Sequence, residues 1–104
     1  MKQFDLFISP LPSARRAMPY IVLLQSDFAR IGRDRVVAPL IVRRRTPPIE
    51  WRLMPRVVVE GQELNVLIPG LTAVSADELR RPVGNLAAER DAIVAALDFL
   101  FLGI

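Results

Sequence analysis

The apolar residues of this chain occur in short blocks that are separated by proline, glycine and charged residues. Short blocks bounded in this way are typical of β-strands rather than of long helices. The pattern predicts strands over residues 4–8, 20–25, 36–42, 57–59 and 64–68. Pro39 lacks the N–H that a central strand donates, so the third of these strands is expected at a sheet edge or with a bulge.

The segments between these blocks carry the residues of turns and loops. Residues 9–16 contain two prolines and predict a loop, because proline cannot donate to a strand ladder. Residues 43–48, three arginines followed by threonine and two prolines, predict a second loop that is basic and stiff. Gly32 permits a turn before the third strand. Residues 60–63 predict a hairpin connection in which Gly61 has a positive φ.

The last part of the chain changes to a helical period. One apolar stripe follows spacings of seven, four, three and four residues, and it consists of Leu86, Ile93, Leu97, Leu100 and Ile104. This pattern predicts a helix over residues 86–104 with Asn85 as its N-cap. A second stripe consists of Ala92, Ala95, Phe99 and Leu102. One small sheet cannot cover both stripes, so we expect a homodimer with Ala95, Phe99 and Leu102 at its interface. A helix wedged into a single core is the alternative.

Length and composition restrict the class of protein. The chain has 104 residues, of which 52% are hydrophobic, and it contains neither cysteine nor histidine. These values predict a single domain over residues 1–104, without disulfides, thiol or histidine catalysis, or a bound cofactor. The longest uncharged stretch, residues 64–76, is shorter than the roughly 20 residues of a membrane span. Lys2 and Asp5 leave no apolar run near the start that is fit for a signal peptide, so we expect a cytoplasmic protein without membrane contact.

The charges are distributed unevenly. Residues 28–56 carry eight arginines and two acids, whereas residues 57–104 carry three arginines and seven acids. Arginine favours bidentate contacts with carboxylates or phosphates, although a merely solvated surface is the alternative. Few aromatic residues are available for base stacking, so direct sequence-specific nucleic-acid binding is not expected. The acids of the last part have no histidine partners, so they indicate a solvated face rather than a metal site.

Three parts of the sequence carry a resemblance to one known family. Residues 25–29, Gln-Ser-Asp-Phe-Ala, followed by residues 35–40, Arg-Val-Val-Ala-Pro-Leu, resemble the Q-S-D to R-x-V-x-P-L block of the CcdB toxin family. Residues 53–63, with Leu-Met-Pro at their start, resemble the middle of the family, and residues 86–104 resemble its C-terminal helix and closing W-G-I. The similarity is collinear over nearly the whole chain. Residues 9–19 match poorly.

The resemblance implies a mainly β fold, a small SH3-like antiparallel β-barrel with a C-terminal α-helix, which MazF-like ribonuclease toxins share. It also implies a homodimeric, non-catalytic toxin of a type II toxin–antitoxin module, of the kind that maintains plasmids. Such a toxin inhibits DNA gyrase by binding the gyrase A protein and trapping the DNA-cleavage complex, and a CcdA-like antitoxin neutralises it. The positions that match the gyrase contacts are Phe28, Ala29, Asp98, Phe101, Leu102, Gly103 and Ile104. Leu102 replaces the family's Trp, and Asp98 replaces its Asn.

An acidic antitoxin tail would complement the arginine-rich middle of the chain, so Arg43, Arg44 and Arg45 are the expected antitoxin contacts. Two other functions remain open. In a ribonuclease toxin of the same fold, the base would be Asp27 or Glu50 and the cation would be one of three arginines, Arg30, Arg33 or Arg45. In an inactive CcdB-like homologue, only antitoxin binding would be retained.

Overall fold

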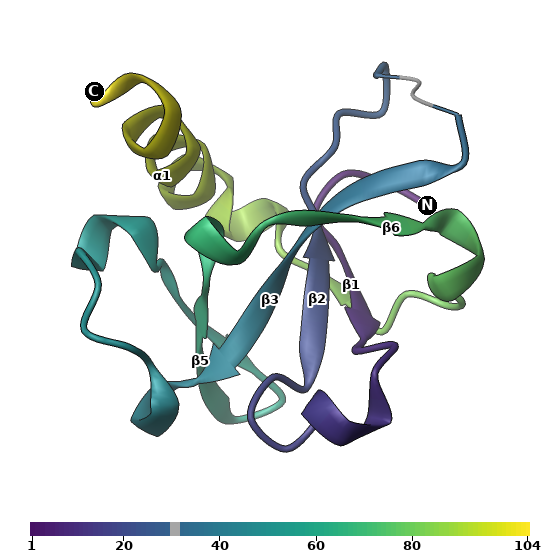
Figure 1. Cartoon of the computed structure of the whole chain (residues 1–104), viewed down its shortest axis with the longest axis horizontal. Coiled ribbons are helices and arrows are strands. Elements are labelled where there is room, and N and C mark those ends of the chain that lie inside the picture. Colours follow the sequence, from purple (N-terminus) through teal and green to yellow (C-terminus); the bar gives the residue numbers. More distant parts are fainter. Residues whose placement is uncertain (30–31) are drawn as a thin grey trace.

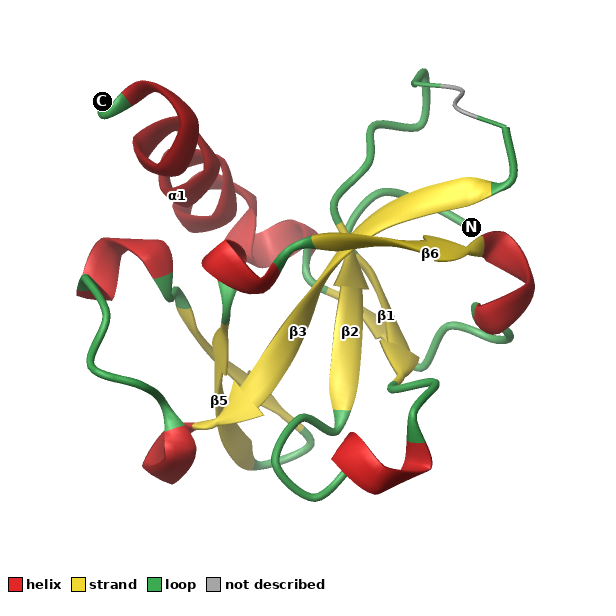
Figure 2. Ribbon diagram, viewed as in Figure 1, coloured by secondary structure: helices red, strands yellow, loops and turns green. Residues whose placement is uncertain are grey.

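The computed structural model describes residues 1–29 and 32–104. Figures 1 and 2 show a curled β-sheet with one α-helix at one end. The strands are β1 (Asp5–Ile8), β2 (Tyr20–Leu23), β3 (Asp34–Val42), β4 (Arg56–Val59), β5 (Gln62–Val66), β6 (Thr72–Ser75) and β7 (Gly84–Asn85). The helix is α1 (Arg90–Leu102), and the 3₁₀ turns are η1 (Pro12–Ala14), η2 (Arg43–Arg45), η3 (Trp51–Leu53), η4 (Ile68–Gly70), η5 (Ala76–Glu78) and η6 (Ala87–Glu89).

The described strands form one antiparallel sheet. Its order is β4-β5-β3-β2-β1-β7, and β6 pairs with β3 beside this path. The sheet curls into a half-barrel, and α1 lies at one of its ends (Figure 1). The predicted fold class, mainly β with a C-terminal helix, is therefore confirmed.

Side chains from both faces of the sheet are buried. On the concave face, Val22 and Leu40 pack with Ile93 of α1 in the larger apolar cluster. On the other face, Ile21 and Leu23 pack with Leu79 in a second cluster. A strand that is buried on both faces shows no alternation of polar and apolar residues. This explains why the block at β2 is almost entirely apolar.

The prediction that Pro39 places its strand at an edge or in a bulge is wrong. β3 is a central strand that pairs with β2 on one side and with β6 and β5 in turn on the other. Pairing with β6 covers residues 34–37, and pairing with β5 covers residues 40–42. Pro39 falls between these two ladders, where no N–H is required, and its carbonyl accepts a hydrogen bond from Leu67 N at 2.8 Å.

The predicted hairpin between β4 and β5 is confirmed, although its turn is tighter than expected. Val59 pairs with Gln62, so Glu60 and Gly61 alone form the connection. Their φ angles are 50° and 78°, which matches the two-residue turns that fit the twist of the strands.

The C-terminal helix is shorter than predicted. α1 begins at Arg90, after η6, and the side chain of Asn85 accepts a hydrogen bond from Ala87 N at 2.6 Å. The Asn85 side chain therefore bonds to the first residue of the 3₁₀ turn η6, and the N-cap of α1 is Glu89. Gly103 ends the helix with a φ of 71°, and its N–H donates to Phe99 O at 3.1 Å. Among the described helices, none combines the length and the apolar character that crossing a membrane requires.

Candidate functional site

The end of α1 presents apolar side chains to solvent. Leu102 is 68% exposed, and Phe101 and Ile104 are also exposed. Asp98, one turn earlier, is exposed as well. Figure 1 shows this last turn, in yellow, projecting from the half-barrel. Because the Gly103 cap closes the helix, Phe101 and Leu102 extend from a closed last turn, and Ile104 follows the cap.

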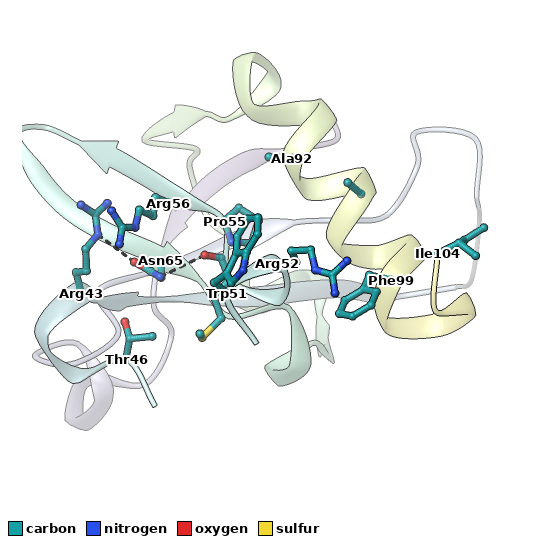
Figure 3. A pocket seen from close by; sticks show the side chains of 12 residues that line it. Arg43, Thr46, Trp51, Arg52, Pro55, Arg56, Asn65, Ala92, Phe99 and Ile104 are labelled. Atoms are coloured by element: carbon teal, nitrogen blue, oxygen red, sulfur yellow. Dashed lines mark hydrogen bonds between the residues drawn. The ribbon is translucent and has the colours of Figure 1, made fainter. Parts of the chain in front are cut away.

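A groove of about 760 Å³ lies between α1 and the segment around η3. From α1 it is lined by Ala95 and Phe99, which belong to the predicted dimer interface, and Ile104 lies at its end (Figure 3). Trp51 of η3, which is 76% exposed, lies opposite. The second apolar stripe of the helix is thus exposed along this groove. Leu102, the third predicted interface residue, does not line it.

Arg52 connects η3 to the helix. Its guanidinium carbon lies 4.0 Å from the centroid of the Phe99 ring, and its Nε donates to Glu50 Oε1 at 3.1 Å. The cation–π contact is visible in Figure 3. Neither Trp51 nor Arg52 is among the functional residues predicted from the sequence. The signal that could have identified them is a lone tryptophan between two charged residues, where burial is improbable.

The three arginines expected to contact an antitoxin differ in their surroundings. The Arg43 guanidinium donates to Asn65 Oδ1 at 3.1 Å and to Leu64 O at 3.1 Å, and it forms an ion pair with Glu63. Most of its donors are therefore used within the sheet, and Figure 3 shows the bond to Asn65. Arg44 and Arg45 are exposed on η2 and remain available to a partner.

The remaining predicted target contacts, Phe28 and Ala29, lie in the connection between β2 and β3. Phe28 is 95% exposed, and its N–H donates to Ser26 Oγ at 3.1 Å. In Figure 1 this connection is at the upper right, whereas the end of α1 is at the upper left. A single chain therefore does not bring Phe28 and Leu102 together.

Three residues of the ribonuclease alternative are engaged in other contacts. Asp27 accepts a hydrogen bond from Gln3 N at 2.7 Å, and Glu50 is paired with Arg52. Arg33 forms an ion pair with Asp77. The described parts of the chain hold no group of three or more acidic side chains that could bind a metal ion.

Two further arginines belong to the same alternative. Arg45 is exposed on η2 and carries no side-chain hydrogen bond within the described parts of the chain. Arg30 lies outside the described residues.

Comparison with known proteins agrees with the sequence pattern and the fold. The family model described as CcdB protein matches residues 3–103, nearly the whole chain. No curated protein matches the sequence. The matched range includes the curled sheet and all of α1. The chain therefore belongs to the CcdB family, the toxins of toxin–antitoxin modules that act with an antitoxin partner.

Proposed function

We propose that this protein is a non-catalytic cytoplasmic inhibitor of DNA gyrase that binds the gyrase A protein and traps the DNA-cleavage complex. The observation that carries the proposal is the exposed apolar end of α1, where Phe101 and Leu102 lie on a capped last turn and Ile104 follows the cap. Apolar side chains on an ordered element are suited to enter a cavity of a partner, because little conformational entropy is lost on binding.

The replacement of Trp by Leu102 changes the expected contact. A leucine has no ring on which an arginine of the target can stack, so a contribution of about 0.5–2 kcal/mol per site is missing. A smaller aliphatic side chain instead favours a purely apolar cavity. We therefore propose that the target cavity is matched to leucine and that Asp98 contacts its rim.

The toxin is proposed to act as a homodimer. The groove between α1 and η3 leaves Ala95 and Trp51 exposed, and a second chain would cover them. A dimer also supplies two copies of the projecting helix end, so two Leu102 side chains and two Phe28 loops would be available to one target.

The antitoxin is proposed to bind through an acidic segment at η2. Arg44 and Arg45 are exposed and would contact its carboxylates, whereas Arg43 holds the base of this turn through its bonds to the sheet. Opposite charges accelerate such an encounter, and ordering of the antitoxin segment on the toxin would follow.

The test is a DNA-cleavage assay with the purified protein and gyrase from its own host. The protein is mixed with gyrase and supercoiled plasmid, and linear DNA is measured after denaturation and proteolysis. We expect linear DNA with the native protein and less with Leu102→Ala. Arg16→Ala, an exposed change in the loop 9–19, is the matched control and should behave like the native protein.

Two outcomes would contradict the proposal. If the native protein binds the gyrase A protein without producing linear DNA, it does not trap the cleavage complex. If only Leu102→Trp binds the gyrase A protein, the target-binding end has lost its gyrase contact. Cleavage of single-stranded RNA by the native protein, lost in Arg45→Ala, would instead support the ribonuclease alternative.

A further inference from the structure

A second groove lies at the end of β1, away from α1. Its volume is about 400 Å³, and it is formed by β1, the chain around η1 and the segment that precedes β7. In Figure 1 β1 ends at the lower right of the sheet, whereas α1 ends at the upper left. No lining residue is shared with the groove beside α1 or with η2. The surface is therefore separate from the one proposed for the target and from the one proposed for the antitoxin.

The walls of this groove combine apolar and cationic side chains. Ile8 and Val83 are 46% and 43% exposed, although both are aliphatic. Three arginines surround them: Arg15, Arg80 and Arg81. Glu78 is the one acidic residue in the lining. The groove therefore has an excess of positive charge next to an apolar patch.

One of the three arginines is oriented by a hydrogen bond, and the other two are free to contact a partner. Arg15 Nε donates to Ser9 O at 2.7 Å, which holds this side chain beside the groove. Arg80 and Arg81 are exposed, and neither takes part in the ion pairs found within the described parts of the chain. Exposed guanidinium groups that take part in no ion pair are suited to bidentate contacts with carboxylates.

The edge of β1 is open at the same place. β1 pairs with β7 only through Asp5 and Leu6, and Val83 N donates to Leu6 O at 2.8 Å. The next position along this ladder is occupied by Pro82, which has no N–H, so pairing ends there. The backbone of Ile8 is therefore left at an unpaired edge, to which a further strand can add.

We propose that this groove binds an extended acidic segment of a partner protein as an added strand at the edge of β1. The backbone of the segment would pair with Ile8, and one apolar side chain would lie between Ile8 and Val83. Carboxylates on either side would contact Arg80 and Arg81. A nucleic acid fits less well, because a phosphate backbone would leave the apolar patch uncovered and no exposed aromatic ring lines the groove. Residues 9–19, which border this groove, match the CcdB pattern poorly, so the specificity would belong to this chain.

The test is fluorescence anisotropy with labelled octapeptides. The first peptide alternates Glu and Val, the second alternates Glu and Ser, and the third alternates Lys and Val. We expect the Glu–Val peptide to bind, the Glu–Ser peptide to bind at least about tenfold more weakly, and the Lys–Val peptide not to bind. The double change Arg80→Glu with Arg81→Glu should weaken binding of the Glu–Val peptide by at least about tenfold. The matched control, Lys2→Glu with Arg90→Glu, makes the same change in net charge at exposed positions outside this groove and outside η2, and it should change the affinity by less than about threefold.

Hydrogen exchange tests the added strand. We expect the amide of Ile8 to exchange more slowly when the Glu–Val peptide is bound. Unchanged exchange at Ile8 would refute strand addition, and equal affinity for the Glu–Ser peptide would reduce the contact to charge alone. An equal loss of affinity in both double variants, or no binding of the Glu–Val peptide by the native protein, would overturn the proposal. None of these measurements involves gyrase, so their outcome is independent of the proposed target.

Discussion

The two faces of α1 are both apolar but lie in different surroundings. On the face toward the sheet, Ile93 and Ala96 are completely buried within the main cluster. On the face toward η3, Ala92 and Ala95 are exposed, and Phe99 is covered only in part, by Arg52. One face of the helix is therefore buried within the protomer, and the other is exposed.

The two faces of α1 contribute to different processes, the buried face to folding and the exposed face to association with a partner. Burial of apolar surface stabilises by about 25 cal/mol per Å², so the buried face contributes to folding of a single chain. The exposed face contributes only when a partner covers it. Substitutions on the two faces should consequently change different measurements, namely the free energy of unfolding and the dissociation constant of the proposed dimer.

The largest effect is expected on the buried face. Ile93→Ala removes methylene groups from a completely buried side chain and should lower the free energy of unfolding by about 2–5 kcal/mol. Chemical denaturation at low protein concentration measures this value. Leu102→Ala removes a similar volume from an exposed position of the same helix and should cost less than about 0.5 kcal/mol. Equal losses would show that the two faces do not differ in burial.

The next effect is expected on the exposed face. Ala95→Asp would place a charge in the proposed dimer interface and should raise the dimer dissociation constant about a hundredfold, or about 2–3 kcal/mol. Analytical ultracentrifugation measures this constant. Ala88→Asp adds the same charge on the exposed turn η6 and serves as the control. A dimer that tolerates Ala95→Asp would be formed by another surface.

Part of the fold could be predicted because its determinants are local. The Glu60–Gly61 turn depends on the φ angles of two adjacent residues, and the period of α1 depends on spacing within one segment. The position of Pro39 depends instead on which strands lie beside β3. The short strands β6 and β7 were not predicted, because their few residues become strands only by pairing with β3 and β1.

The candidate site likewise has one wall that could be predicted from the sequence and one that could not. The exposed helix stripe with Ala95 and Phe99 could be predicted from helical spacing. The other wall of the groove, with Trp51 and Arg52, could not, because η3 and α1 are distant in the sequence and meet only in the folded chain. Sequence alone does not show that Arg43, rather than Arg44 or Arg45, bonds to β5.

A smaller effect is expected where the exposed face ends. Gly103→Ala places a β-carbon at a φ of 71° and should destabilise the cap by about 1 kcal/mol, so the last turn frays. Hydrogen exchange at Gly103, whose N–H bonds to Phe99 O, measures this fraying. Gly103→Asn should retain more protection than Gly103→Ala, because asparagine tolerates this conformation better. Equal protection in both variants would show that the cap does not order the helix end.

The smallest effect is expected at the contact that partly covers the exposed face. Arg52→Gln removes the cation over the Phe99 ring and should lower the free energy of unfolding by about 0.5–1 kcal/mol. The ring should also become more mobile, which ¹H NMR line shapes of Phe99 would report. Arg56→Gln removes an exposed charge from the same groove without touching the ring and serves as the control. If both variants behave alike, Phe99 is held by the helix alone.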